Sequence, residues 1–282
     1  YFMSSNNIAV RVDNEWRFFD PAGTYIPIRM LRWQEEGLNA MISDPVRPIY
    51  VQTELSPAEK SLQKRTAALS LSEDGTIEGD VRIEYTGHFD IERKEYNDEY
   101  SPEQREQTLR ESIKEHMSSA ELSNIRVENA TDPVRPFAYS FHVRIPDYAQ
   151  RTGKRLFLQP GFFQKGVKPL FSTSNRTHPI YFSYPWTEND TVTIQLPEGF
   201  AVDTADSPEA LDTVDSGKYS VAIAVSKDGR TLDYKRSFLF GAHGSILFQR
   251  TAYDRLKRIF DELHERDNHT ITLRQTGRAA QD

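Results

Sequence analysis

The sequence predicts a mainly β protein: two β-rich, sandwich-like domains, each with about one helix, preceded by a terminal hairpin. Three observations support this class. Short stretches of alternating apolar and polar residues, the pattern of half-buried strands, recur along most of the 282 residues. Turn signals containing glycine or proline separate many of them. Apolar residues at helical spacing are clear in only two stretches, 101–117 and 251–267.

The first predicted hairpin covers residues 7–20 and turns at Asp13-Asn14. Its apolar residues are Ile8, Val10 and Val12 in the first strand and Trp16, Phe18 and Phe19 in the second. We expect Trp16 and Phe18 to pair opposite the aliphatic residues, and the hairpin to complete a larger sheet, because a lone hairpin is only marginally stable in water. The prolines of residues 21–50 remove backbone donors, so this stretch is predicted to be loop and linker.

The first of the two β-rich domains, residues 51–171, opens with a hairpin. Residues 66–71 and 77–85 alternate around Gly75, and glycine tolerates the positive φ that a tight turn requires. The apolar pattern of the second strand continues, so we expect this strand to run towards Phe89 and Ile91. Further strands are predicted at 137–145 and 155–163.

The second domain, residues 172–282, is predicted to contain several strands and a final helix. The strands are predicted at 179–184, 191–196, 219–225, 231–240 and 269–274. Asp228-Gly229 is typical of the turn in a β-hairpin.

The two predicted helices carry different signals. The helix at 101–117 begins with Ser101 as its N-cap and Pro102 at its first position, and Gln104 completes a capping box. Its apolar stripe is narrow, so we expect most of its surface to be wet. The helix at 251–267 has one apolar face, formed by Ala252, Leu256, Ile259, Phe260 and Leu263. We expect this face to pack on a sheet.

Composition excludes several classes of function. The formal net charge of −7 argues against a general nucleic-acid surface, which needs clustered Lys and Arg. The absence of cysteine excludes a disulfide, a thiolate metal site and a cysteine nucleophile within this sequence. No apolar run approaches the roughly 18 residues of a membrane span, and no motif indicates a cofactor. Because the sequence opens on Tyr1 rather than Met, we expect it to be a piece of a longer protein.

Four features could carry chemistry, and each also has a simpler structural explanation. Asp20, at a strand end before a proline, could be a triad acid that orients an imidazole, or a cap for the following loop. The acidic stretch 203–215 could bind calcium, but its spacing is not that of an EF-hand and a solvated loop is favoured. The seven histidines show no metal-ligand spacing and are expected at the surface. Aromatic residues between 157 and 186 could stack on sugars, but core packing explains them more simply.

The pentapeptide Asp-Pro-Val-Arg-Pro occurs twice, at 44–48 and at 132–136. The residues that flank the two copies do not match. Two similar turns therefore explain the repeat better than a domain duplication does.

Three segments together resemble the C-terminal portion of bacterial transglutaminase-like proteins, members of the papain-like cysteine-protease superfamily. Residues 12–21 (VDNEWRFFDP) are similar to the closing hairpin of the core, residues 71–87 with Arg93 to the hairpin that follows it, and residues 176–185, 196–200 and 234–236 with the last helix to the family's C-terminal domain of unknown function. The family's triad is a Cys, a His and an Asp, and the resemblance matches Asp20 to the Asp. The nucleophile would lie upstream, and Ser4 to Asn7 occupy the position before Ile8 where the His is expected.

The resemblance implies that residues 1–50 are the tail end of a transglutaminase-like core plus a linker. The chain would be the non-catalytic C-terminal region of such a protein, in the periplasm or outside a bacterial cell. Its partner would be the upstream core domain, or a protein or peptide, and no cofactor is expected. Three alternatives stay open: an extracellular glycan- or protein-binding module, part of a cysteine protease or transglutaminase whose Cys and His lie upstream, and a hydrolase with paired carboxylates.

Overall fold

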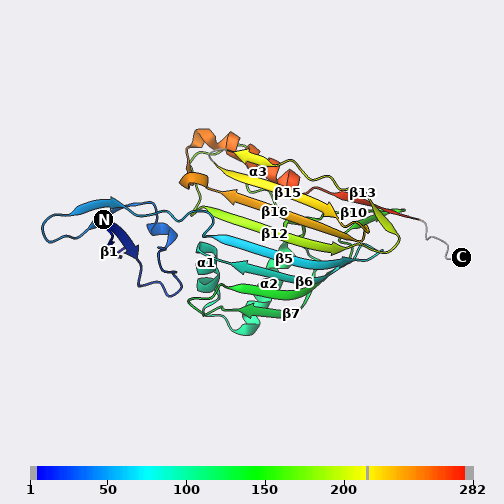
Figure 1. Ribbon diagram of the computed structural model, residues 1–282, viewed down its shortest axis with the longest axis horizontal. Coiled ribbons are helices and arrows are strands. Elements are labelled where there is room, and N and C mark those ends of the chain that lie inside the picture. Colours follow the sequence, from blue (N-terminus) through cyan, green and yellow to red (C-terminus); the bar gives the residue numbers. More distant parts are fainter. Residues whose placement is uncertain (1–4, 214–215, 277–282) are drawn as a thin grey trace.

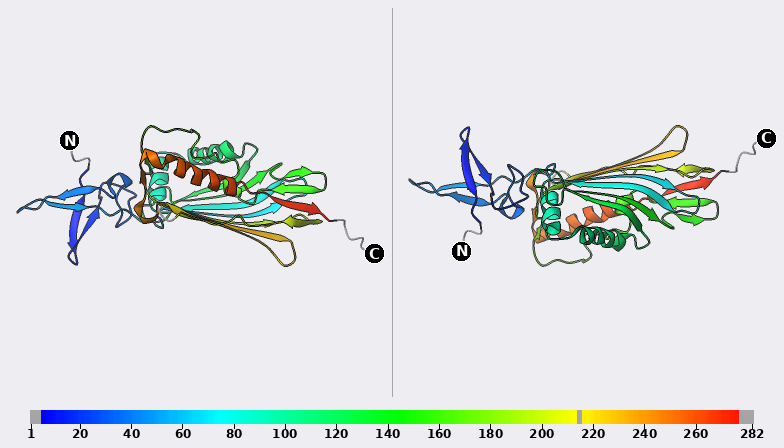
Figure 2. Two further views of the ribbon diagram at one scale, coloured as in Figure 1. Left: turned by 90° about the horizontal axis from the view of Figure 1, so that it is seen from above. Right: turned by 90° about the horizontal axis from the view of Figure 1, so that it is seen from below.

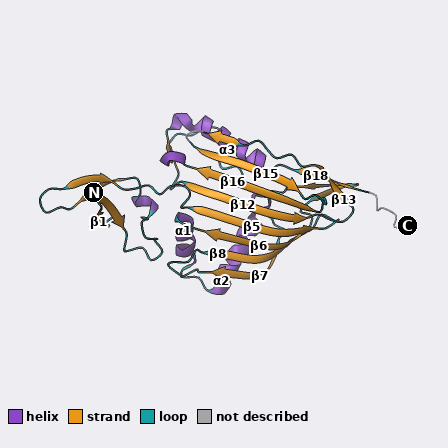
Figure 3. Ribbon diagram, viewed as in Figure 1, coloured by secondary structure: helices purple, strands orange, loops and turns teal. Residues whose placement is uncertain are grey.

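The computed structural model describes residues 5–213 and 216–276. Its largest element is an eight-stranded sheet in the order β14-β15-β16-β12-β5-β6-β8-β7 (Figure 1). The strands are β5 (Leu62–Leu71), β6 (Ile77–Tyr85), β7 (Glu121–Glu128), β8 (Ala138–Ile145), β12 (Trp186–Gln195), β14 (Leu211–Thr213), β15 (Gly217–Val225) and β16 (Thr231–Phe240). Neighbouring strands are antiparallel except β5 and β12, which run parallel. Strands make up most of the regular structure (Figure 3), so the predicted mainly β class is confirmed.

A four-stranded sheet in the order β13-β18-β10-β9 packs into the same core. Its strands are β9 (Gln150–Thr152), β10 (Arg155–Leu158), β13 (Phe200–Thr204) and β18 (Ile271–Gln275). Figure 2 shows α2 (Pro102–His116) and α3 (Tyr253–Asp267) on one side of the main sheet, whose other face is open to solvent. The third helix, α1 (His88–Asn97), stands at the end of the sheet that faces the N-terminal hairpins.

The sheets do not follow the predicted division into two sandwich-like domains at residues 171/172. Residues 62–70 of β5 pair with residues 187–195 of β12, so the main sheet takes its strands from both predicted domains. One hydrophobic core likewise joins residues of both, for instance Val81 and Phe141 with Val192 and Leu232. The sequence pattern shows which face of a strand is buried, but not which distant strand lies beside it.

Most local predictions are confirmed, but the predicted course of β6 beyond Tyr85 was wrong. The hairpin β5-β6, the capping box of α2 and the helix α3 are all present. However, β6 ends at Tyr85 and does not run on towards Phe89 and Ile91, which belong to α1. Gly87 produces the break: its φ is +61°, and a Cβ there would lie 2.4 Å from the carbonyl oxygen of Lys60.

The N-terminal unit, residues 5–57, consists mainly of two separate hairpins. Their strands are β1 (Ile8–Val12), β2 (Glu15–Phe19), β3 (Asn39–Ile42) and β4 (Ile49–Gln52). The stretch 21–50, predicted to be loop and linker, therefore includes β3 and the start of β4. The β1-β2 hairpin joins no larger sheet, contrary to our expectation. Its register pairs Ile8 with Phe19, so Ile8, Val10 and Val12 lie on the opposite face from Trp16 and Phe18.

Shorter elements complete the chain. They are β11 (Ile180–Tyr181), β17 (Leu247–Phe248) and single 3-10 turns at Trp33–Glu35, Phe162–Gln164, Ala242–Gly244 and Arg250–Ala252. Strand β11 pairs with β17 beside the N-terminal unit. The predicted strands at 155–163 and 179–184 are thus much shorter than expected, and β7 was not predicted.

The two copies of Asp-Pro-Val-Arg-Pro form the same turn. Asp44 Oδ1 accepts hydrogen bonds from the amides of Val46 and Arg47, and Asp132 Oδ1 accepts the same two from Val134 and Arg135. Both valines are almost fully exposed. The prediction of two similar turns is confirmed.

Candidate functional site

Asp20 lies at the end of β2, with its side chain buried. Its Oδ1 accepts a hydrogen bond of 2.9 Å from the amide of Ala22, and its Oδ2 accepts one of 2.7 Å from Arg32 Nε. Arg32 also donates to Glu35, which accepts a bond from Asn7 as well. Asp20 therefore caps the following turn and is neutralised by an arginine. Its role as a triad acid stays a prediction from the resemblance.

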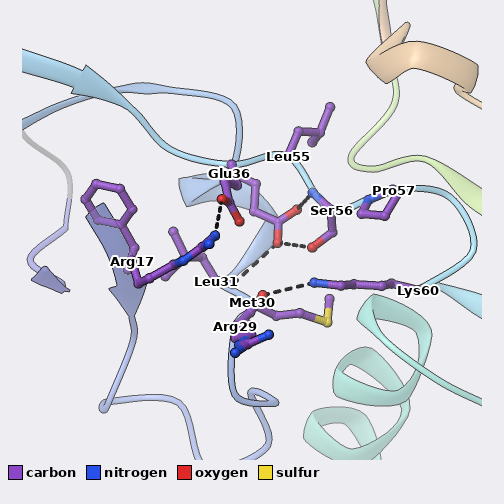
Figure 4. Close-up of a pocket in the computed structure, with 11 residues that line it drawn as sticks. Arg17, Arg29, Met30, Leu31, Glu36, Leu55, Ser56, Pro57 and Lys60 are labelled. Atoms are coloured by element: carbon purple, nitrogen blue, oxygen red, sulfur yellow. Dashed lines mark hydrogen bonds and ion pairs between the residues drawn. The ribbon is translucent and has the colours of Figure 1, made fainter. Parts of the chain in front are cut away.

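A buried polar cluster joins the N-terminal unit to α1. Glu36 accepts hydrogen bonds from the amide of Ser56 at 2.8 Å and from its hydroxyl at 2.7 Å (Figure 4). Nε2 of His88 lies 3.1 Å from Glu36 Oε2, the same oxygen that accepts from the Ser56 amide. Burial alone would raise the pKa of Glu36, but His88 and Ser56 outweigh it and lower this pKa. The cluster therefore holds an ionised carboxylate at the junction.

The order of the three groups excludes a serine triad. In a triad the serine hydroxyl donates to the imidazole, and the acid holds the imidazole from its other side. Here the hydroxyl of Ser56 donates to the carboxylate instead, so the imidazole cannot take its proton. We interpret the cluster as a structural contact that fixes the N-terminal unit to α1. Our expectation that all seven histidines lie at the surface was wrong for His88, which is 1% exposed.

Further contacts fix the N-terminal unit on the body of the protein, residues 58–276. The hydroxyl of Tyr25 donates to Asp98 at the end of α1, and the ring of Trp33 lies 6.3 Å from that of Tyr181. Between the two parts is an open groove of about 1000 Å³. Leu38, Tyr181 and Leu247 line it, and each is about half exposed.

A second charged cluster lies inside the body. We call it the buried charge network: Arg65, Glu188, Asp190, Arg236 and Asp267. It bridges the covered face of β5, β12 and β16 and the end of α3. Arg65 binds both oxygens of Asp190, at 2.6 and 3.0 Å, and Arg236 binds both oxygens of Asp267, at 2.7 and 2.9 Å.

Glu188 connects the two halves of this network. Its Oε2 accepts one hydrogen bond from Arg65 and one from Arg236. Burial by itself would raise the pKa of Glu188, but the two guanidinium groups outweigh it and lower the pKa to about 2. The stability that this lowered pKa contributes is therefore present above pH 4.5 and is lost as the pH falls towards 2.

Paired carboxylates thus exist, but they are unsuited to hydrolysis. Glu188 and Asp190 point into the body, and each is bound by an arginine. A general acid needs a raised pKa, and the pKa of Glu188 is lowered. Burial raises the pKa of Asp267, but Arg236 binds both of its oxygens. The network is a structural feature, and it gives no support to a carboxylate hydrolase.

The aromatic residues between 157 and 186 belong mostly to the core. Phe162, Phe171 and Tyr184 are buried, whereas Phe157 is 36% and Tyr181 50% exposed. The two exposed rings come from separate elements, β10 and β11. The predicted core packing is confirmed for the buried rings, and the glycan-binding alternative gains no support from them.

The acidic stretch 203–215 is partly exposed and makes ordinary surface ion pairs. Asp203 lies 3.8 Å from Arg155, and Asp212 lies 3.5 Å from Lys218. Asp215 is outside the described residues. Within residues 5–213 and 216–276, the acidic and histidine side chains form no group of three that could hold a metal ion.

His142 faces the open side of the main sheet between two carboxylates. Its Nδ1 lies 2.9 Å from Asp80 and its Nε2 3.0 Å from Glu78. Hydrogen bonds to Glu78 and Asp80 raise the pKa of His142 above its usual 6.5. The resulting stabilisation is full below pH 6.5 and is lost as the pH rises through the raised pKa.

We predict that His142→Gln lowers the free energy of unfolding at pH 5.5 by about 1 kcal/mol or less, because the three side chains are partly exposed. At pH 9 the loss should be smaller. Urea unfolding at both pH values measures the difference, with the exposed His116→Gln as the control. A loss that is equal at both pH values, or larger at pH 9, would contradict the prediction.

Exposed apolar side chains are concentrated in the N-terminal unit. Of the fifteen large hydrophobic residues that are exposed in the described structure, eight lie within the first 50 residues. They are Ile8, Val10, Val12, Ile28, Leu38, Met41, Val46 and Tyr50. Ile8, Val10 and Val12 form one face of β1, so this strand presents an uncovered apolar row. The N-terminal unit is therefore the candidate interaction site.

Comparisons with known proteins found a family model that matches part of the chain and a solved structure that resembles it. Residues 154–273 match the model of a family described as "Domain of Unknown Function with solved-structure structure (DUF3858)". A crystal structure of a "putative protease" from Parabacteroides distasonis ATCC 8503 is similar, with 11% sequence identity and a TM-score of 0.42. The match covers 95% of this chain but only 35% of that protein. No curated protein matched.

The helices were also compared with the requirements of a bilayer. Among the described residues, no helix has both the length and the apolar character needed to cross a membrane. The apolar surface of the N-terminal unit belongs to strands and loops.

Proposed function

We propose that this chain is the non-catalytic C-terminal region of a transglutaminase-like protein, exported to the periplasm or outside the cell. In this proposal the N-terminal unit is the surface on which the catalytic core packs. The single observation that carries it is the uncovered apolar row of β1 together with the exposed residues of the β3-β4 hairpin. Apolar side chains gathered on one uncovered strand face are typical of interaction sites.

The way the N-terminal unit is attached supports the same function. Glu36, Ser56 and His88 are all buried, and the bond from Tyr25 to Asp98 adds a second attachment point on α1. The hairpins are thus held in a defined orientation while their apolar faces stay free. A preorganised surface binds a partner with a smaller loss of conformational entropy than a mobile one.

The chemistry of the described residues supports a non-catalytic role. Nucleophilic catalysis by cysteine needs a thiolate beside a base, and the chain has no cysteine. Asp20 is held by Arg32, and the hydroxyl of Ser56 is held by Glu36. We therefore assign support of the core to this chain, and acyl-transfer chemistry to residues outside it.

A binding measurement tests this proposal. The purified chain is titrated with a separately produced transglutaminase-like core domain of the same protein, and the dissociation constant is measured by calorimetry. We expect the double variant Val10→Asp, Val12→Asp to bind at least about tenfold more weakly, because it places charge in the contact. Val225→Asp, at an exposed valine of the body, is the matched control and should bind normally. Equal affinity of the double variant and the unmodified chain would contradict the proposal.

A further inference from the structure

A small crevice opens in the N-terminal unit beside the buried cluster of Glu36, Ser56 and His88. It is lined by Arg17 and Phe18 of β2, the turn at residues 29–31, Glu36, residues 54–57 and Lys60. Its volume is about 50 Å³, which is room for one small chemical group rather than a substrate. Figure 4 shows the side chains of Arg17 and Lys60 pointing toward one another from opposite sides of the crevice.

Two of the three basic residues at this crevice have no acidic partner. Arg17 is paired with Glu15 at 2.7 Å and with Glu54 at 2.9 Å. The ammonium group of Lys60 donates instead to the backbone carbonyl of Arg29, at 3.1 Å. Within the described residues, neither Arg29 nor Lys60 takes part in an ion pair. Glu36 also borders the crevice, but Ser56 and His88 occupy its carboxylate.

The backbone at Arg29 provides an independent observation. The amide of Met30 donates to the carbonyl of Pro27, which closes a tight turn with Arg29 at its third position. Arg29 has a φ of +70° there. Glycine adopts this left-handed conformation freely, whereas an arginine is strained in it. Position 29 thus carries a cationic side chain although its backbone conformation favours glycine, which has no side chain.

We propose that the crevice binds a carboxylate side chain of the partner that covers the N-terminal unit, with Arg29 and Lys60 as its cationic ligands. The apolar walls, formed by Phe18, Met30 and Leu55, would contact the aliphatic part of that side chain. The carboxylate replaces the acidic partner that Arg29 and Lys60 lack. This inference rests on the proposed function, since it names the chemistry of the group that docks there.

The test uses the full chain and a defined probe. N-acetylglutamate N-methylamide is titrated into the protein, and the arginine side-chain NMR signals are followed at low salt. We expect saturable binding that is at least fivefold tighter than that of the glutamine analogue, and weaker at high salt. Inorganic phosphate is titrated in parallel. Binding of phosphate as tight as that of the glutamate probe would assign the crevice to a free anion and overturn the proposal.

Variants distinguish a loss of probe binding from a loss of folding stability. Arg29→Gly removes the cation and also relieves the backbone strain, so it should lower the affinity at least fivefold while the thermal midpoint stays equal or rises. Lys60→Gln should lower the affinity as well. Arg47→Ala, at an exposed arginine in the β3-β4 turn, is the control and should leave it unchanged. An Arg29→Gly protein that is folded and binds the probe normally would overturn the inference. The Val10, Val12 experiment is unaffected by either result, so the two proposals can fail separately.

Discussion

Replacing Arg236 by alanine is expected to lower the free energy of unfolding by about 3–5 kcal/mol. Arg236 is 5% exposed and binds both oxygens of Asp267 and one oxygen of Glu188. Its removal leaves Asp267, itself 7% exposed, with only the hydroxyl of Tyr219 as a side-chain donor. An unpaired buried carboxylate is destabilising because it has lost its water without gaining a partner.

Urea unfolding monitored by circular dichroism measures this change. Lys235→Ala is the matched control, because Lys235 lies on the same strand but on the open face of the sheet. The double variant Arg236→Met, Asp267→Leu removes both charges together and should be less destabilising than Arg236→Ala alone. A loss below about 1 kcal/mol for Arg236→Ala would show that the network does not stabilise the fold.

Phe260→Ala should be about as severe, with an expected loss of about 3–5 kcal/mol. Phe260 lies on the buried face of α3, and its ring packs among four other phenylalanine rings. They are Phe171, Phe182, Phe238 and Phe240, with centroids 5.4 to 6.1 Å away. Two of these rings come from β16, so the substitution opens a cavity between α3 and the main sheet.

Arg258→Ala, on the exposed side of the same helix, is the control for helix propensity and charge. The midpoints of urea unfolding are compared for the two variants. If Phe260→Ala shifts the midpoint no more than Arg258→Ala does, the helix is peripheral and the predicted packing is wrong.

Features encoded by neighbouring residues could be predicted from the sequence. The capping box of α2 involves Ser101 and Gln104 alone. The turn at Gly75 has a positive φ that glycine tolerates, which is a local signal, although a Cβ there would also clash with the carbonyl of Ala149. The apolar face of α3 is also local, because residues three and four apart lie on one side of a helix. These elements formed as predicted.

Features that depend on distant pairing could not be predicted. The parallel contact between β5 and β12 joins residues more than a hundred positions apart, and it merges what look like two domains. Helix α1 was missed because Phe89 and Ile91 continue the alternation of β6, and only the close approach of Gly87 to Lys60 reveals the break.

The same difference between local and distant contacts applies to the candidate site. Asp20 stood out because of its local context, and the structure places it at a strand end as expected, bound to Arg32. The buried charges Arg65 and Arg236 gave no local signal, since a single arginine in a strand is read as solvent-exposed. His88 was equally hidden, because its partner Glu36 lies in another part of the chain.

If the proposed function is correct, the β1-β2 hairpin is folded in this chain and becomes covered only when the core domain is present. Amide hydrogen exchange tests both parts of this statement at Ile8, Val10 and Arg17, whose amides lie between the two paired strands, in this chain alone and in its complex with the core. We predict exchange slower than in a random coil for the chain alone, and at least about tenfold slower again in the complex. Random-coil rates in the chain alone would show that the hairpin is not folded, and rates unchanged by the core would show that the core does not cover it.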